Sequence, residues 1–305
     1  MDPKIVFFGF GVGFLVGMTG MGGGSLMTPL LVLLFGVKPT TAIGTDIAYA
    51  AITKTAGSWR HLKLKTVNMP LVYWMAIGSV PMAILGVWVL DILKRRLGDQ
   101  LDETVFAILA ACLLVVGAAT LLRGFFLANK IQERDNFEMH TRHKVAAVGI
   151  GAATGFVIGL SSAGSGTLIG MMLLTVYRLR PQKVVGADVV HAAILLWAAG
   201  IAHWIGGNVD LGLAANILVG SIPGVLIGSQ LAVKVPTGLL RNALGIVLIA
   251  SAITLITKEH VPKAILIPSM SVAALVIAGL FAFQIGLHRQ RQRQLRARRA
   301  PAVVG

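Results

Sequence analysis

Glycine and hydroxyl residues gather at two places in the sequence, in a pattern that is typical of anion binding. The two stretches are Gly20-Met21-Gly22-Gly23-Gly24-Ser25 and Ser162-Ala163-Gly164-Ser165-Gly166-Thr167. Each interrupts an apolar run, so a new helix would start at Ser25 and at Thr167 with free backbone N–H groups and a positive dipole end. We therefore predict a small anionic substrate, bound by Thr19, Gly22, Gly23, Gly24, Ser25, Ser161, Ser162, Gly164, Ser165, Gly166 and Thr167. The alternative is that the glycines serve only close helix packing.

Two aspartates follow these breaks, in Gly44-Thr45-Asp46 and Gly186-Ala187-Asp188. An ionisable side chain inside an apolar span is costly and marks a functional position by default. Two roles remain open for each carboxylate. It could couple transport to protons, or it could accept hydrogen bonds from the backbone N–H groups of the break.

Three further side chains are candidates for accessory roles. Lys54 either supplies positive charge near the site or extends to the membrane surface. His191 lies one helical turn after Asp188 and could tune it or share a proton with it. Tyr49 occupies the matching position in the first half of the chain, so the two halves are not equivalent there.

Several kinds of chemistry are excluded. No lysine follows Gly22-Gly23-Gly24-Ser25 as a phosphate-binding loop requires, and no H-E-x-x-H motif or cysteine pair is present. We predict no enzyme activity, no cofactor and no metal. The net charge of +15 comes from short loops and from a tail with six arginines, a pattern that orients membrane proteins and does not indicate nucleic-acid binding.

The composition predicts an all-α, polytopic protein embedded in the lipid bilayer. The chain is 56% hydrophobic, 13% charged and has a mean hydropathy of +0.81. Several apolar runs exceed the ~18 residues that mark a membrane-spanning helix. These runs are Met69–Leu90, Thr104–Leu122, Leu211–Val233, Leu239–Ile256 and Ala264–Leu287. The apolar runs beside each break are shorter, so each break is predicted to form a re-entrant or half-spanning hairpin.

The sequence also predicts a duplication within one integral membrane domain, 1–305. Matching Gly, Pro, Asp and His residues recur at one fixed offset, the one that relates Asp46 to Asp188. The predicted parts are repeat 1 (5–122), a cytoplasmic linker (123–145), repeat 2 (146–257), an extra helix (264–287) and a basic cytoplasmic tail (288–305). Each repeat holds a glycine-broken hairpin and three transmembrane helices. Most of the 27 Lys and Arg residues lie on one side if the repeats have inverted topology and the C-terminus is cytoplasmic.

The run from Gly13 to Ser25, followed by Pro29 and by Gly44-Thr45-Asp46, resembles the TauE/SafE family of membrane proteins. The resemblance covers roughly residues 5–257. It implies a multi-pass transporter of the cell inner membrane that exports sulfite, organosulfonates or related sulfur-containing anions, by alternating access. Two other functions stay open: a passive anion channel, and a non-transporting membrane scaffold or accessory protein. No oligomeric state is predicted.

Overall fold

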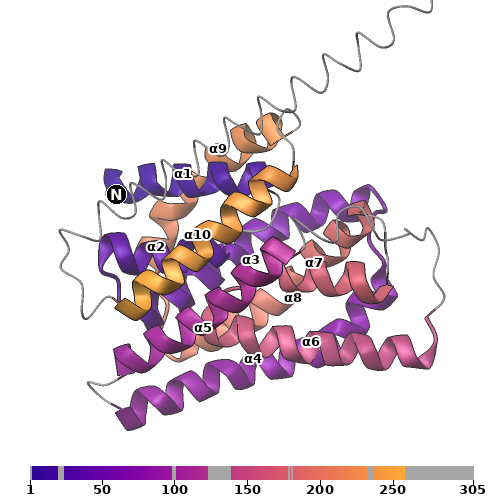
Figure 1. Ribbon diagram of the computed structural model, residues 1–305, viewed down its shortest axis with the longest axis horizontal. Coiled ribbons are helices and arrows are strands. Elements are labelled where there is room, and N and C mark those ends of the chain that lie inside the picture. Colours follow the sequence, from indigo (N-terminus) through magenta and orange to yellow (C-terminus); the bar gives the residue numbers. More distant parts are fainter. Residues whose placement is uncertain are drawn as a thin grey trace, which may run out of the picture.

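The computed structural model describes residues 2–19, 24–97, 101–122, 139–177, 179, 181–232 and 237–257, and this part of the chain is helical (Figure 1). Its elements are α1 (Pro3–Thr19), α2 (Gly24–Phe35), α3 (Pro39–Lys63), α4 (Met69–Leu97), α5 (Leu101–Leu122), α6 (Thr141–Ser161), α7 (Leu168–Met172), the short π-helix η3 (Leu173–Tyr177), α8 (Pro181–Ile205), α9 (Leu211–Ala232) and α10 (Thr237–Thr257). The extra helix 264–287, the tail and most of the linker lie outside the described residues, as do Gly20 to Gly23.

Within the described residues, five helices are long and apolar enough to cross a membrane: α4, α5, α6, α8 and α9. This finding confirms an all-α protein with several candidate spans. The helix α3 does not meet the same criterion, although it has 25 residues. It carries Asp46 and Lys54 along its length and three basic residues in its last turn, which lower its hydropathy.

One arm of the second hairpin is longer than predicted. The helix α6 begins at Thr141, inside the predicted linker, and its 21 residues reach about 31 Å at 1.5 Å per residue. That is long enough to cross the bilayer, so the expectation of two short arms is wrong here. The first turn of α6 is polar, and the ammonium of its Lys144 makes a cation–π contact with the Trp74 ring, 5.3 Å from the ring centroid. The other arm, α7 with η3, is short.

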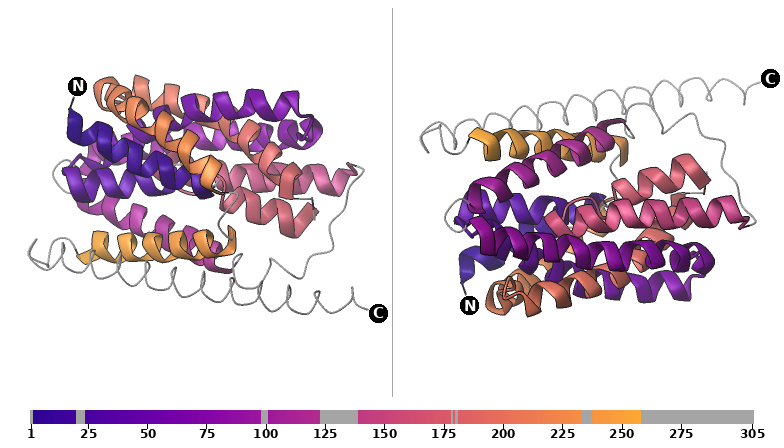
Figure 2. Two further views of the ribbon diagram at one scale, coloured as in Figure 1. Left: turned by 90° about the horizontal axis from the view of Figure 1, so that it is seen from above. Right: turned by 90° about the horizontal axis from the view of Figure 1, so that it is seen from below.

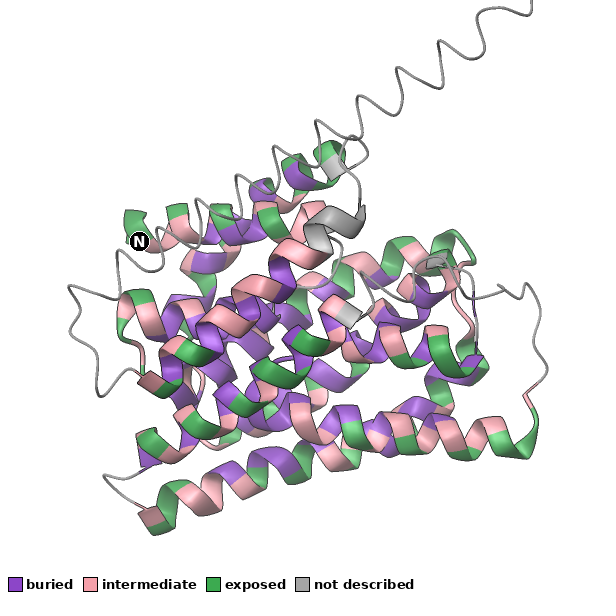
Figure 3. Ribbon diagram, in the orientation of Figure 1, coloured by how far each residue is buried: buried purple, intermediate pink, exposed green. Residues whose placement is uncertain are grey.

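The helices pack in pairs around a central pair. The helices α3 and α8 lie against each other in the middle of the bundle, with α1 against α9 on one side and α6 against α4 on the other (Figure 1). A fourth pair, α5 with α10, lies together on one face (Figure 2). Buried residues gather in the middle of this bundle and exposed ones on its outer faces (Figure 3).

Glycines set the close approach within two of these pairs. A Cβ atom on Gly13 of α1 would overlap the carbonyl oxygen of Ser221 on α9. In the same way, a Cβ atom on Gly155 of α6 would overlap the carbonyl oxygen of Ser79 on α4. Only glycine allows helix backbones to touch at this distance in lipid. The two contacts are equivalent in sequence: Gly13 and Gly155, and likewise Ser79 and Ser221, have the same separation as Asp46 and Asp188.

The turn between α8 and α9 packs against the start of α3 and the end of α4. Asn208 in this turn is buried, and its side chain accepts a hydrogen bond from Lys94 Nζ (2.9 Å) and donates one to Asp91 Oδ1 (3.0 Å). Gly44 of α3 lies against the Asn208 backbone. Lys94, at the end of α4, is therefore held by a buried amide.

Candidate functional site

The break between α6 and α7 lies at the centre of the molecule and is fully buried. Ser161 ends α6, and Ser162 takes the left-handed conformation with φ 59°. Gly164 (φ 107°) and Gly166 (φ 89°) follow in conformations that glycine adopts without strain. Thr167 is then the N-cap of α7. The break thus falls where the sequence predicted it, and its glycines are needed for the turn itself.

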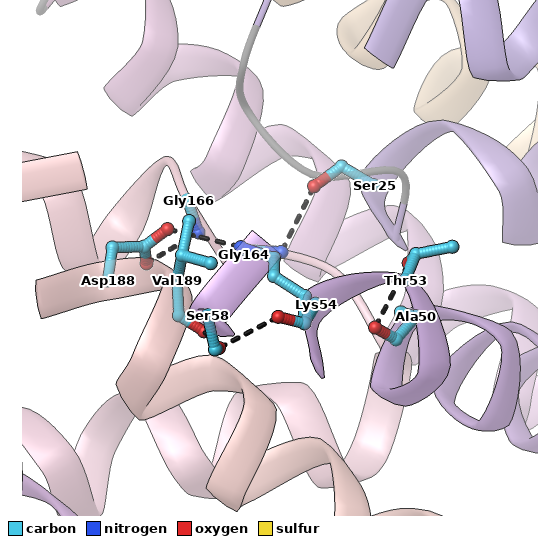
Figure 4. A network of polar contacts seen from close by, with 9 residues as sticks. All are labelled: Ser25, Ala50, Thr53, Lys54, Ser58, Gly164, Gly166, Asp188 and Val189. Atoms are coloured by element: carbon cyan, nitrogen blue, oxygen red, sulfur yellow. Dashed lines mark hydrogen bonds and ion pairs between the residues drawn. The ribbon is translucent and has the colours of Figure 1, made fainter. Parts of the chain in front are cut away.

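Asp188 of α8 is bound to this break and to α3 (Figure 4). Its Oδ1 atom accepts a hydrogen bond from the Gly166 N–H at 3.1 Å, and its Oδ2 atom lies 3.2 Å from Lys54 Nζ. Both side chains are buried, so Lys54 does not extend to the membrane surface. Asp188 is therefore placed where its predicted hydrogen-bonding role requires it, and its part in coupling stays a prediction.

Further hydrogen bonds fasten the same region together (Figure 4). The Gly164 N–H donates to Ser25 Oγ at 3.1 Å, which joins the start of α2 to the second break. The Ser58 hydroxyl donates to the carbonyl of Lys54 (2.8 Å) and to that of Val189 (3.2 Å), which joins α3 to α8. These bonds join α2 and α3 from the first half of the chain to the second break and α8 from the second half.

These contacts change the interpretation of the second break as an anion site. The N–H groups of Gly164 and Gly166 are not free, because they donate to Ser25 and to Asp188. The Ala163 N–H also donates, to Ser161 Oγ at 3.3 Å. A protein carboxylate thus occupies the place predicted for the anion. The glycines of the first break, Gly22 and Gly23, lie outside the described residues, as does the side chain of Thr19.

Asp46 of α3 has a different environment from Asp188. Its Oδ2 atom accepts hydrogen bonds from the hydroxyls of Thr28 (2.6 Å) and Ser162, and those two hydroxyl oxygens are 3.0 Å apart. Its Oδ1 atom has no hydrogen-bond partner among the described residues, although the side chain is 0% exposed. The three oxygens come from α3, α2 and the second break, so Asp46 connects both hairpins.

The other candidates lie in the same core but make different contacts from those expected. His191 Nε2 lies 2.8 Å from Ser79 Oγ on α4, and its Nδ1 atom has no partner within the described part of the chain. Tyr49 lies beside Ser221 of α9, and its buried hydroxyl makes no hydrogen bond to any described residue. The buried Ser165 hydroxyl is also unpartnered there. Among these candidates, His191 therefore forms its hydrogen bond with Ser79 and not with Asp188.

Two members of the site were missed from the sequence. Thr28 lies three residues after Ser25, which places both hydroxyls on one face of α2; this spacing in an apolar helix was a usable signal. Ser79 lies in an apolar run two residues before Pro81, and no local pattern there indicates a role in the site. Within the described residues no three His, Cys, Asp or Glu side chains come together to hold a metal ion.

The chain matches a known protein family over most of its length. The family described as "Sulfite exporter TauE/SafE" matches residues 5–255. The chain belongs to the TauE/SafE family. A relative from Bacillus subtilis, named "Probable membrane transporter protein YjnA", is 38% identical over 257 residues, which cover 84% of this chain and 100% of the relative. A second B. subtilis relative, YdhB, is 27% identical, with coverage of 79% and 94%. The archaeal relative MJ0441 from Methanocaldococcus jannaschii is 26% identical, with coverage of 74% and 80%.

These similarities confirm the resemblance found in the sequence. No solved structure matches the chain. The protein is a multi-pass membrane transporter of the TauE/SafE family, and the family is one of transporters and not of enzymes.

Proposed function

We propose that this TauE/SafE transporter exports a small sulfur-containing anion, sulfite or an organosulfonate, across the cell inner membrane. The family description supports the substrate class. The observation that carries the proposal is the buried polar centre, where α2, α3, α8 and the second break meet inside an apolar bundle. Non-helical backbone at membrane depth is tolerated only inside protein or beside a water-filled cavity, and many transporters bind their substrate at such broken helices.

The proposed anion site lies between the two breaks. We propose that three buried groups without a hydrogen-bond partner among the described residues donate to the sulfur oxyanion oxygens: the hydroxyls of Tyr49 and Ser165, and Nδ1 of His191. An unpaired buried donor costs about 1–3 kcal/mol, so an anion that accepts these bonds would be stabilised there. From the sequence we further propose that backbone N–H groups of Gly22 to Gly24 contribute to this site, since Ser25, which follows them in the chain, accepts a hydrogen bond from the Gly164 N–H.

We further propose that transport uses alternating access between two inverted repeats. Two matched contacts support this: α1 packs on α9 as α6 packs on α4. A third match joins Gly44 to Asn208 and Gly186 to Thr66, again at the same offset. Each half therefore packs its hairpin on the other half. The distribution of Lys and Arg in the loops supports a cytoplasmic C-terminus.

Transport is tested by flux into proteoliposomes. Labelled sulfite, sulfate and a small sulfonate are offered with and without a pH gradient, to wild type, Gly23→Leu and the control Thr53→Ala. Among the described residues, the Thr53 hydroxyl bonds only to carbonyls of its own helix. Saturable uptake with counterflow, lost in Gly23→Leu and kept in the control, is expected. Unsaturable flux would indicate a channel, and no flux for any of these anions would refute the substrate class.

Orientation is tested by labelling single cysteines in a Cys112→Ala background. The side chain of Ile205, at the end of α8, is 82% exposed and is predicted to face the outside. Ile205→Cys should react with an impermeant maleimide in intact cells, and Gly305→Cys in the tail should react only after permeabilisation. The reverse pattern would contradict the proposed orientation.

A further inference from the structure

Asp46 and Asp188 occupy matching positions in the sequence but differ in their charge partners. Asp188 is paired with Lys54. At the position in the second half that matches Lys54 stands Leu196, a buried apolar residue. Asp46 therefore has no lysine counterpart, and no Lys, Arg or His of the described residues forms an ion pair with it.

The surroundings of Asp46 contain hydroxyl groups and no compensating charge. The Thr28 and Ser162 hydroxyls both donate to Oδ2, which leaves Oδ1 fully buried without a partner among the described residues. A buried carboxylate without a counter-charge is expensive unless a cation neutralises it. One carboxylate oxygen together with two hydroxyl oxygens is a ligand set for a small hard cation.

Few other titratable groups approach this carboxylate from the elements around it. The helix α2 carries none, and α5 carries only Cys112 beyond its acidic first turn. On α8, Asp188 is already ion-paired and His191 is bonded to α4. Asp210, before α9, accepts a hydrogen bond from the first turn of that helix. Tyr49, one turn along α3, interacts electrostatically with Asp46.

We propose that Asp46 alone binds the coupling cation, one H⁺ or Na⁺ per chain, and that Asp188 stays locked in its ion pair with Lys54. The assignment rests on the proposed transport function, since it names the coupling site of that function. A cation at Asp46 acts on α2 through Thr28 and on the second break through Ser162. Its binding and release therefore change the contact between the two hairpins that would move during alternating access.

The site is tested without any substrate, by infrared difference spectroscopy and ²²Na⁺ binding on the reconstituted protein. The variants are Asp46→Asn and the double variant Lys54→Met/Asp188→Asn, which removes the ion pair without leaving a single buried charge. For H⁺, a carboxylic-acid C=O band that titrates with pH is expected in wild type and in the double variant, and its loss in Asp46→Asn. For Na⁺, one bound ion per chain is expected in the same two proteins, and none in Asp46→Asn.

Two results would overturn the proposal. One is a band or bound Na⁺ that persists in Asp46→Asn and disappears in the double variant; the other is neither signal in wild type. If Asp46→Asn does not fold, Thr28→Val serves instead, because it keeps the carboxyl group and removes one of its donors. The band should then shift in frequency, or Na⁺ affinity should fall at least tenfold, and an unchanged signal counts against the site.

Sulfite flux in the same vesicles separates the two proposals. A titrating Asp46 in a protein that moves no sulfite would refute the substrate class and keep the cation site. Gradient-driven sulfite flux that survives Asp46→Asn would refute the cation site at Asp46 and keep the substrate class.

Discussion

Removal of the Lys54 charge should lower the free energy of unfolding, and removal of the Asp188 charge as well should restore most of that free energy. In Lys54→Met, Asp188 keeps its hydrogen bond from the Gly166 N–H but loses its cation in a site where its side chain is 5% exposed. Breaking a buried ion pair from one side costs about 3–5 kcal/mol, because the remaining charge is left uncompensated. We expect a loss of that size in Lys54→Met and a similar loss in Asp188→Asn.

The double variant Lys54→Met/Asp188→Asn should be far closer to wild type than either single variant. Methionine fills a volume similar to that of the lysine stem, and the amide oxygen of the new asparagine can still accept the Gly166 N–H. Replacing both partners of a buried pair is often neutral or stabilising. The expected interaction energy from the double-mutant cycle is therefore about 3 kcal/mol or more.

Equilibrium unfolding by SDS in lipid–detergent micelles measures the four proteins of this cycle. Thr53→Ala is again a suitable control, since its hydroxyl bonds only within α3. Additive losses in the double variant would show that Lys54 and Asp188 do not depend on each other. A wild-type unfolding curve for Lys54→Met would likewise refute the reasoning, because it would mean that the pair is not desolvated.

Three further predictions concern packing and polar contacts. Gly155→Ala should cost about 1–3 kcal/mol or prevent folding, because its Cβ would overlap a carbonyl of α4, whereas Gly149→Ala meets nothing within 4 Å and should be tolerated; size-exclusion profiles and SDS unfolding compare the two. Thr28→Val should abolish gradient-driven sulfite uptake by removing the hydroxyl between the hairpins, while Thr53→Val should keep it, and equal flux in both would contradict this role. Asn208→Leu should lower stability by about 1–3 kcal/mol, because it leaves two partners on α4 unpaired; an unchanged unfolding midpoint would refute this.

The local features of the site could be predicted from the sequence. The break at Ser162 to Thr167 and the start of a helix near Ser25 follow from glycine, which adopts the positive φ angles found there, and from hydroxyl residues, which favour helix starts. Glycines spaced four apart in α6 favour close helix contacts in lipid, but this spacing does not indicate that the partner is α4.

The partners across the centre could not be predicted in the same way. Lys54 and Asp188 are separated by 134 residues, and Ser25 and Gly164 by 139. Their pairing depends on how α3 lies against α8 and on where α2 begins relative to the second break, which no local pattern specifies. The break was therefore expected to offer free N–H groups, although the fold brings its own acceptors to them.

The helix α1 packs on α9 and α6 packs on α4, and this arrangement affects the order in which contacts form during synthesis. The helices α4 and α6, which pack on each other, are separated in sequence by one helix and a linker. In contrast, Gly9 of α1 contacts Ile217 of α9, which lies much further along the chain. Contacts between residues far apart in sequence form late, because they require closure of a long loop. We therefore expect that α1 stays in the membrane with its glycine face against lipid until α9 has been inserted, and that the α1–α9 contact forms after the α4–α6 contact.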